Sequence, residues 1–151
     1  MLGIISDTHG LLRPEAVDAL RGSSLIIHAG DVGAPEILAE LRNIAPVKAV
    51  RGNVDTDHWA LALPKSLLLD FEGHAVHVRH ILDDPMPVPA EINAVIYGHS
   101  HKPSIQDRDG VLYLNPGSAG PRRFRLPVSV ARIEILDGQL SARIISLDPT
   151  S

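Results

Sequence analysis

The feature that most constrains the fold is an alternation of short apolar runs and helix-type segments in the first third of the chain. Apolar runs at Leu2–Ser6, Leu25–Ala29 and Val47–Val50 stop at polar or glycine residues, as buried strands do. Between them lie Pro14–Arg21 and Pro35–Ile44, which both begin with proline, a residue suited to the first turn of a helix. Strands that alternate with helices favour a parallel sheet, and ligands bind such sheets at the carboxyl ends of the strands.

The middle of the chain predicts strands and a hairpin. Ser66–Phe71 and Ala75–His80 are expected to form neighbouring strands, and Ala94–Tyr97 is expected to form another. A tight hairpin is predicted at Asp109-Gly110, because this pair suits a two-residue turn. The strands that flank it are Ser104–Arg108 and Val111–Asn115.

A second hairpin is predicted at Asp137-Gly138, between apolar residues from Val128 to Ile135 and from Leu140 to Ile144. The apolar alternation changes near Ala131, so the register of the first of these strands is expected to slip there. No linker or repeat separates the two halves. We therefore expect one α/β domain over residues 1–151.

Composition limits the classes of partner. The 151-residue chain carries a formal net charge of −4, which argues against a nucleic-acid backbone as its main partner. It contains no cysteine, so disulfides and thiolate sites are excluded. No apolar run approaches the roughly 20 residues of a membrane span, and the N-terminus lacks the features of a secretory signal. We expect a soluble, cytoplasmic protein without a membrane partner.

Side chains that bind metal ions stand at the ends of the predicted strands. Residues two apart in an extended chain point to the same side, so Asp7 with His9, and His99 with His101, are expected to face one cavity. Imidazoles, carboxylates and an amide oxygen suit Mn, Fe, Zn, Ni or Co. Seven such residues are too many for one catalytic ion and predict two ions about 3.5–4 Å apart. They are Asp7, His9, Asp31, Asn53, His80, His99 and His101.

The order of these residues resembles a known family. The motifs are Asp-x-His at 7–9, Gly-Asp at 30–31, Gly-Asn at 52–53, His80, and Gly-His-x-His at 98–101. The glycines are expected to allow close approach of the backbone. In this order the motifs resemble the calcineurin-like metallophosphoesterase superfamily. The short chain and the segment Asn115-Pro116-Gly117-Ser118 are most similar to its small YfcE-like phosphodiesterases.

The resemblance implies a fold, a cofactor and a reaction. The fold would be a four-layer αββα sandwich of two mixed sheets. Two divalent metal ions, with Mn as the first candidate, would hold a bridging hydroxide that attacks a small phosphate ester. The resemblance assigns Asp7, His9, Asp31 and His101 to the first ion. It assigns the bridging Asp31 with Asn53, His80 and His99 to the second, and gives Asn53 a part in catalysis.

The sequence departs from the family pattern at two places. Many members have a histidine directly after the Gly-Asn pair, proposed to protonate the leaving group, whereas this chain has Val54. Asp55 and His58 are the candidate substitutes. Ile81 stands where relatives have glycine after the metal histidine, and a proline-rich segment follows where relatives have a helix. His77 is the weaker alternative to His80 as a ligand, because it falls on the other side of the predicted strand.

Several residues have simpler interpretations, and a non-catalytic function stays open. His28 lies inside an apolar run and is expected to be a hydrogen-bonded core residue. The arginines at 122, 123 and 125 either attract a phosphate or form a solvated loop. The alternative function is that of a scaffold: the small subunit of retromer has the family fold and binds partner proteins. Relatives of this size often pair, so a homo-oligomer is also compatible with the resemblance.

Overall fold

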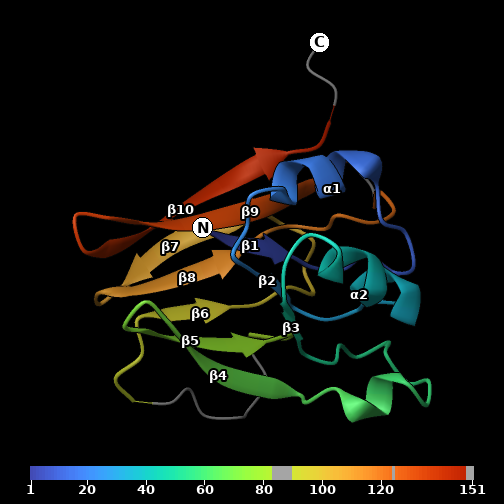
Figure 1. Ribbon diagram of the computed structural model, residues 1–151, viewed down its shortest axis with the longest axis horizontal. Coiled ribbons are helices and arrows are strands. Elements are labelled where there is room, and N and C mark those ends of the chain that lie inside the picture. Colours follow the sequence, from blue (N-terminus) through green and yellow to red (C-terminus); the bar gives the residue numbers. More distant parts are fainter. Residues whose placement is uncertain (83–89, 124, 149–151) are drawn as a thin grey trace.

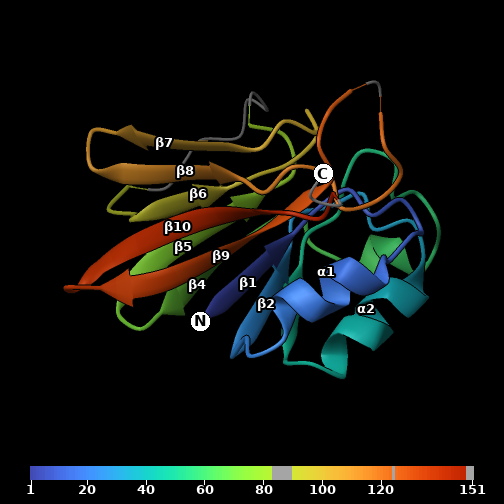
Figure 2. The same cartoon turned by 90° about the horizontal axis from the view of Figure 1, so that it is seen from above.

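The computed structural model describes residues 1–82, 90–123 and 125–148, and it consists of two packed β-sheets with helices on one side. Each sheet has five strands. The helices α1 (Pro14–Leu20) and α2 (Pro35–Arg42) lie together against one sheet, as Figures 1 and 2 show. Both helices begin with proline, and α2 turns Ile37, Leu38 and Leu41 into the protein.

The first sheet has the strand order β10-β9-β1-β2-β3. Its three neighbouring strands β1, β2 and β3 are parallel, and β9 runs antiparallel to both β1 and β10. The predicted alternation of strands and helices is therefore confirmed for this part of the chain. The strands are β1 (Leu2–Ile5), β2 (Leu25–His28), β3 (Val47–Ala49), β9 (Ser129–Leu136) and β10 (Gln139–Ser146).

The second sheet has the order β4-β5-β6-β8-β7. It is mixed: β5, β6 and β8 are parallel, whereas β4 and β7 pair antiparallel with β5 and β8. A short 3-10 helix, η1 (Ala60–Ala62), precedes it. The strands are β4 (Ser66–Phe71), β5 (His74–Arg79), β6 (Ala94–Ile96), β7 (Ser104–Arg108) and β8 (Val111–Asn115).

Two apolar clusters hold the layers together. The cluster between the sheets contains fully buried side chains from both, including Ile4, Val78 and Leu114. The cluster between the first sheet and the helices contains Leu20 of α1 and Leu41 of α2. Fully burying one such leucine contributes about 1.5–3 kcal/mol to folding.

The two predicted mixed sheets are confirmed, and with them the α/β class of the fold. In the part of the chain that the structure describes, both α-helices cover the first sheet. The second sheet carries a smaller cluster of Ile92, Val95 and Tyr97. The predicted proline-rich segment falls on residues 83–89, which lie outside the described residues.

The predicted hairpins form at the expected turns. Asp109-Gly110 and Asp137-Gly138 adopt positive φ at both positions, as a type I′ turn requires. The expected slip near Ala131 is wrong, because β9 pairs with β10 in one continuous register. Val130 packs with the helices while Ala131 and Ile133 face the second sheet, so the strand is buried on both sides and its apolar residues are adjacent.

Candidate metal centre

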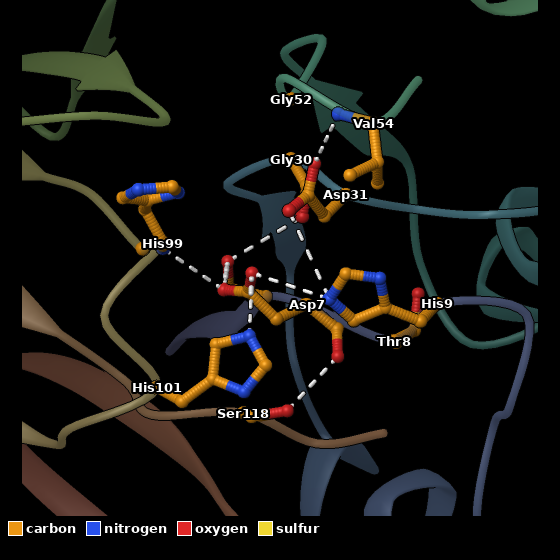
Figure 3. A network of polar contacts seen from close by, with 12 residues as sticks. Asp7, Thr8, His9, Gly30, Asp31, Gly52, Val54, His99, His101 and Ser118 are labelled. Carbon is orange, nitrogen blue, oxygen red and sulfur yellow. Dashed lines mark hydrogen bonds and ion pairs between the residues drawn. The ribbon is translucent and has the colours of Figure 1, made fainter. Parts of the chain in front are cut away.

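Five loops from the two sheets meet at one end of the sandwich, where the candidate ligands lie. The loops after β1, β2 and β3 carry Asp7, His9, Asp31 and Asn53, and those after β5 and β6 carry His80, His99 and His101. Figure 3 shows Asp7 between His9, His101 and the loop of His99, with Asp31 facing it. The centre is therefore built across the interface of the sheets.

The ligand loops have left-handed backbone rather than the extended backbone expected from sequence. Asp7, His9, Asp31, His99 and His101 all have φ between 47° and 75°. The expectation that residues two apart share a side because the chain is extended is wrong here, although both pairs still converge. Loop-to-loop hydrogen bonds hold this geometry: the N–H of Asp7 donates to Gly30 O at 3.0 Å, and that of His9 to Asp31 O at 2.9 Å.

Two glycines permit the loops to approach this closely. A Cβ on Gly52 would lie 2.0 Å from Oδ1 of Asp31. A Cβ on Gly98 would lie 2.2 Å from Oγ of Ser6 and 2.7 Å from Oδ2 of Asp7. A side chain at either position would displace a carboxylate of the centre, so the expected close approach of the backbone at these glycines is confirmed.

The first group of candidate ligands is Asp7, His9 and His101, which offer atoms within 4.8 Å of one another. Oδ1 of Asp7 lies 3.3 Å from Nε2 of His101 and 3.7 Å from Nε2 of His9. The other oxygen, Oδ2, accepts hydrogen bonds from Ser6 Oγ at 2.6 Å and from the N–H of His99 at 3.2 Å. These bonds orient the carboxylate so that Oδ1 faces the imidazoles.

The second group is Asp31, His80 and His99, again within 4.8 Å. Oδ2 of Asp31 lies 3.0 Å from Nε2 of His80 and also 3.8 Å from Nε2 of His9, which places it between the groups. Oδ1 of Asp31 accepts the N–H of Val54 at 3.0 Å. The amide oxygen of Asn53 lies 3.1 Å from Nδ1 of His99, so Asn53 joins this group.

The buried donor and acceptor atoms fit divalent cations. Oδ1 of Asp7 and the Nε2 atoms of His9 and His80 are buried without a hydrogen-bond partner. Nδ1 of His80 donates to Ala29 O at 2.7 Å, which leaves the lone pair on Nε2 facing the aspartates. Buried polar atoms without partners are costly, and coordination to a metal ion satisfies them. Both groups thus have the donor set of a metal site.

The pKa shifts in the centre follow from the same contacts. Burial raises the pKa of the Asp7 carboxyl, but the imidazoles of His101, His9 and His80 outweigh it and hold that pKa well below its usual range. The Asp7 carboxylate raises the pKa of His9. Burial lowers the pKa of His80, but Asp31 and Asp7 outweigh it, and the net shift is upward.

His28 supports the loops from beneath, as the sequence predicted for a core residue. Its Nδ1 accepts the N–H of Gly30 at 3.1 Å. Its Nε2–H donates to Thr8 Oγ1 at 3.0 Å, because that hydroxyl in turn donates to Val32 O at 2.7 Å. Complete burial lowers the pKa of His28 to about 4, so it is neutral at physiological pH.

Asp55 organises the loops through contacts with their backbone. Its carboxylate accepts three backbone N–H groups, from Val32 at 3.1 Å, Gly33 at 3.1 Å and Gly52 at 2.9 Å. Both oxygens of the carboxylate are engaged by these backbone N–H groups, so the structure does not support Asp55 as the replacement for the missing acid. Sequence reasoning missed this role, since two of the three residues that Asp55 holds, Val32 and Gly33, lie on another loop, the one after β2.

The Asn115–Ser118 segment also holds ligand loops. Nδ2 of Asn115 donates to Gly98 O at 3.2 Å, and Oγ of Ser118 donates to Asp7 O at 3.0 Å. His77 is buried on β5 and is not among the groups that converge. His58 is exposed, and its side chain makes no hydrogen bond or ion pair with a candidate ligand among the described residues.

Comparison with known proteins defines the class. A family model for the calcineurin-like phosphoesterase superfamily domain matches residues 1–138, and the chain belongs to this family. A probable metallophosphoesterase of Methanothermobacter thermautotrophicus is 38% identical over 96% of this chain and 91% of that protein. Phosphodiesterase YfcE of Escherichia coli K12 is 26% identical over 85% of this chain and 84% of its own length. The resemblance inferred from the motifs is thereby confirmed.

A solved structure shows the same fold. Vps29 of Entamoeba histolytica, determined with Zn²⁺, superposes with a TM-score of 0.73 over 97% of this chain and 99% of its own. The two sequences are 19% identical, so this likeness concerns the fold alone. Within the residues that the structure describes, no helix is both long and apolar enough to cross a membrane.

Proposed function

We propose that this protein is a phosphodiesterase that hydrolyses a small phosphate ester at a centre of two divalent metal ions. One observation carries the proposal: ligand-type side chains from both sheets converge in two groups, and several of their buried nitrogen and oxygen atoms have no hydrogen-bond partner. Asp7, His9 and His101 would hold one cation. Asp31, Asn53, His80 and His99 would hold the other, with Asp31 between the two. When bound, the cations supply a hydroxide nucleophile and neutralise charge on the phosphoryl oxygens.

The residues of the chain orient these groups. Ser6 and the N–H of His99 fix the carboxylate of Asp7, and the N–H of Val54 fixes that of Asp31. His80 donates through Nδ1 to Ala29 O and so presents Nε2. Such preorganisation matters because the donors need not rearrange as charge develops at phosphorus.

Protonation of the leaving group is left to solvent. Val54, which is 49% exposed, stands where many relatives have a histidine, and Asp55 is committed to backbone N–H groups. Without a general acid, esters whose leaving groups depart as stable anions are favoured. We therefore expect aryl phosphodiesters to react faster than alkyl ones.

The test is hydrolysis of bis-p-nitrophenyl phosphate by protein treated with a chelator and by protein to which Mn or Ni has been restored. The same two measurements are made on the variants Asp31→Asn and His99→Ala. Activity that requires metal and is lost in both variants is the expected result. Asp57→Asn, an exposed carboxylate in the loop after Asn53, is the matched control and should retain activity.

The alternative is a scaffold that binds a partner protein through the same fold. The Vps29 likeness keeps this alternative open, since it concerns the fold and not the reaction. Metal-loaded protein that hydrolyses neither diester nor monoester substrates would overturn the proposal and favour the scaffold. The localisation we propose is cytoplasmic.

A further inference from the structure

A large open hollow lies directly beside the metal centre. It has a volume of about 1060 Å³ and shares His99 with the second ligand group. The loop between β8 and β9, which forms one wall, lies at the same end of the sheets as the loop after β1 (Figure 2). The lining residues are His99, Ser100, Lys102, Arg123, Arg125 and Leu126.

The neighbouring arginines of this loop have different roles. Arg122 donates to Leu126 O at 3.0 Å and pairs with Asp148, so it anchors the loop and does not line the hollow. Within the described residues, the charged ends of Lys102, Arg123 and Arg125 make no hydrogen bond or ion pair. The hollow therefore carries three cationic side chains available to a ligand, and no acidic residue is in its described lining.

The cationic side chains of the hollow lie next to the centre, because His99 belongs both to the lining of the hollow and to the second ligand group. Guanidinium groups bind phosphate with paired, directed hydrogen bonds, and an ammonium adds a further point charge. Leu126 adds an apolar side chain to the lining. This combination suits a phosphate carried on an organic group better than a free inorganic anion.

We propose that the hollow binds a second phosphate of the substrate, so that the substrate class is a nucleotide-type phosphodiester with an additional phosphate group. The assignment of this ligand as substrate rests on the proposed function. The volume of the hollow reaches the upper end of the range for ligand pockets, about 300–1,000 Å³, which leaves room for a nucleoside beside the phosphate. In the reaction, water adds across the scissile P–O bond, the alcohol departs, and the second phosphate remains intact.

The test uses two substrates that differ by one phosphate: the 5′-(p-nitrophenyl phosphate) of thymidine, with and without a 3′-phosphate. Both release p-nitrophenolate from the same bond. We expect kcat/KM to be about tenfold higher for the 3′-phosphorylated substrate, since charge-assisted hydrogen bonds contribute on this scale. Arg123→Gln with Arg125→Gln should abolish the preference, by lowering kcat/KM for the 3′-phosphorylated substrate to the value for the substrate without the 3′-phosphate. Arg143→Gln, an exposed arginine on β10, is the matched control and should keep the preference.

A binding measurement separates this proposal from the catalytic one. Calorimetry with thymidine 3′,5′-bisphosphate and thymidine 5′-monophosphate should show tighter binding of the bisphosphate by wild type, and equal binding by the double variant. A wild type that is inactive on every ester but keeps this difference would overturn the catalytic proposal alone. Equal kcat/KM for the two substrates, or a preference that survives in the double variant, would overturn the proposal for the hollow.

Discussion

The loops of the first sheet carry both carboxylates of the centre, Asp7 and Asp31, whereas the loops of the second sheet carry three of its four imidazoles, His80, His99 and His101. The carboxylates are buried, and each has one oxygen fixed by a backbone N–H of a neighbouring loop, that of His99 for Asp7 and that of Val54 for Asp31. His99, in contrast, is exposed. Neither sheet alone has a complete ligand set, so a bound cation joins the two sheets. The first sheet would supply the charge of the site, and the second most of its neutral ligands.

The largest expected effect follows from removing a carboxylate of the first sheet. Asp7→Asn should lower kcat/KM for bis-p-nitrophenyl phosphate by on the order of a thousandfold, which corresponds to about 4 kcal/mol, because it removes a buried charge that faces three imidazoles. His101→Asn, which changes a ligand from the second sheet, should lower kcat/KM by less. Equal losses in steady-state assays of the two variants would contradict the division between the sheets.

Metal binding should stabilise the sandwich as a whole. At a free metal concentration a thousandfold above Kd, the added stability is about 4 kcal/mol, which raises Tm by about 10 °C for a chain of this size. Thermal unfolding with chelator and with Mn measures this shift. Asp7→Asn should show a smaller increase in Tm when the metal is added. A Tm that is the same with and without metal would show that the cation does not join the sheets.

The interior of the first sheet should show its own pH dependence. The pKa of folded His28 is about 4, below the unfolded value of 6.5, so the unfolded chain binds more protons between these values. Stability is therefore lost as pH falls from about 6.5 to 4, by up to about 3 kcal/mol from this residue.

Urea unfolding of chelated wild type and His28→Gln across this pH range isolates that contribution. The free-energy difference between wild type and variant should shrink towards low pH. A constant difference for His28→Gln would mean that burial does not lower its pKa.

The smallest expected effect is the loss of stability caused by a substitution in a hairpin turn, and it should be equal for the hairpins of the two sheets. Gly138→Ala in the β9–β10 turn and Gly110→Ala in the β7–β8 turn each force a side chain into a left-handed conformation, where no atom lies within 4 Å of the new Cβ. Each should cost about 1 kcal/mol in urea unfolding and leave hydrolysis unchanged. Unequal costs would show that the hairpins differ in more than their turns.

Much of the fold could be predicted because its signals are local. Each apolar run that forms β1, β2 or β3, and each Asp-Gly pair of the two hairpins, is a signal contained in a few consecutive residues. The register at Ala131 could not be predicted, because burial of β9 on both sides depends on helices and a sheet that are distant in sequence.

The candidate ligands could be found by their position at strand ends, but not how they are held. The left-handed backbone at Asp7 depends on a bond to Gly30, which is far along the chain. Asp55 has the sequence context of a proton donor, and only the assembled loops show that it binds three backbone N–H groups. The hollow beside His99 is likewise built from two separate segments.

The left-handed backbone of the centre also has an evolutionary consequence. Aspartate and histidine at positive φ cost more than glycine there, by about 1–2 kcal/mol for an ordinary residue. Under the proposed function, selection for metal binding keeps them in place, and a lineage released from that selection would gain stability by replacing them with glycine. The residue types at Asp7, His9, Asp31, His99 and His101 should therefore record, in the sequence of any relative, whether its lineage still depends on the metals.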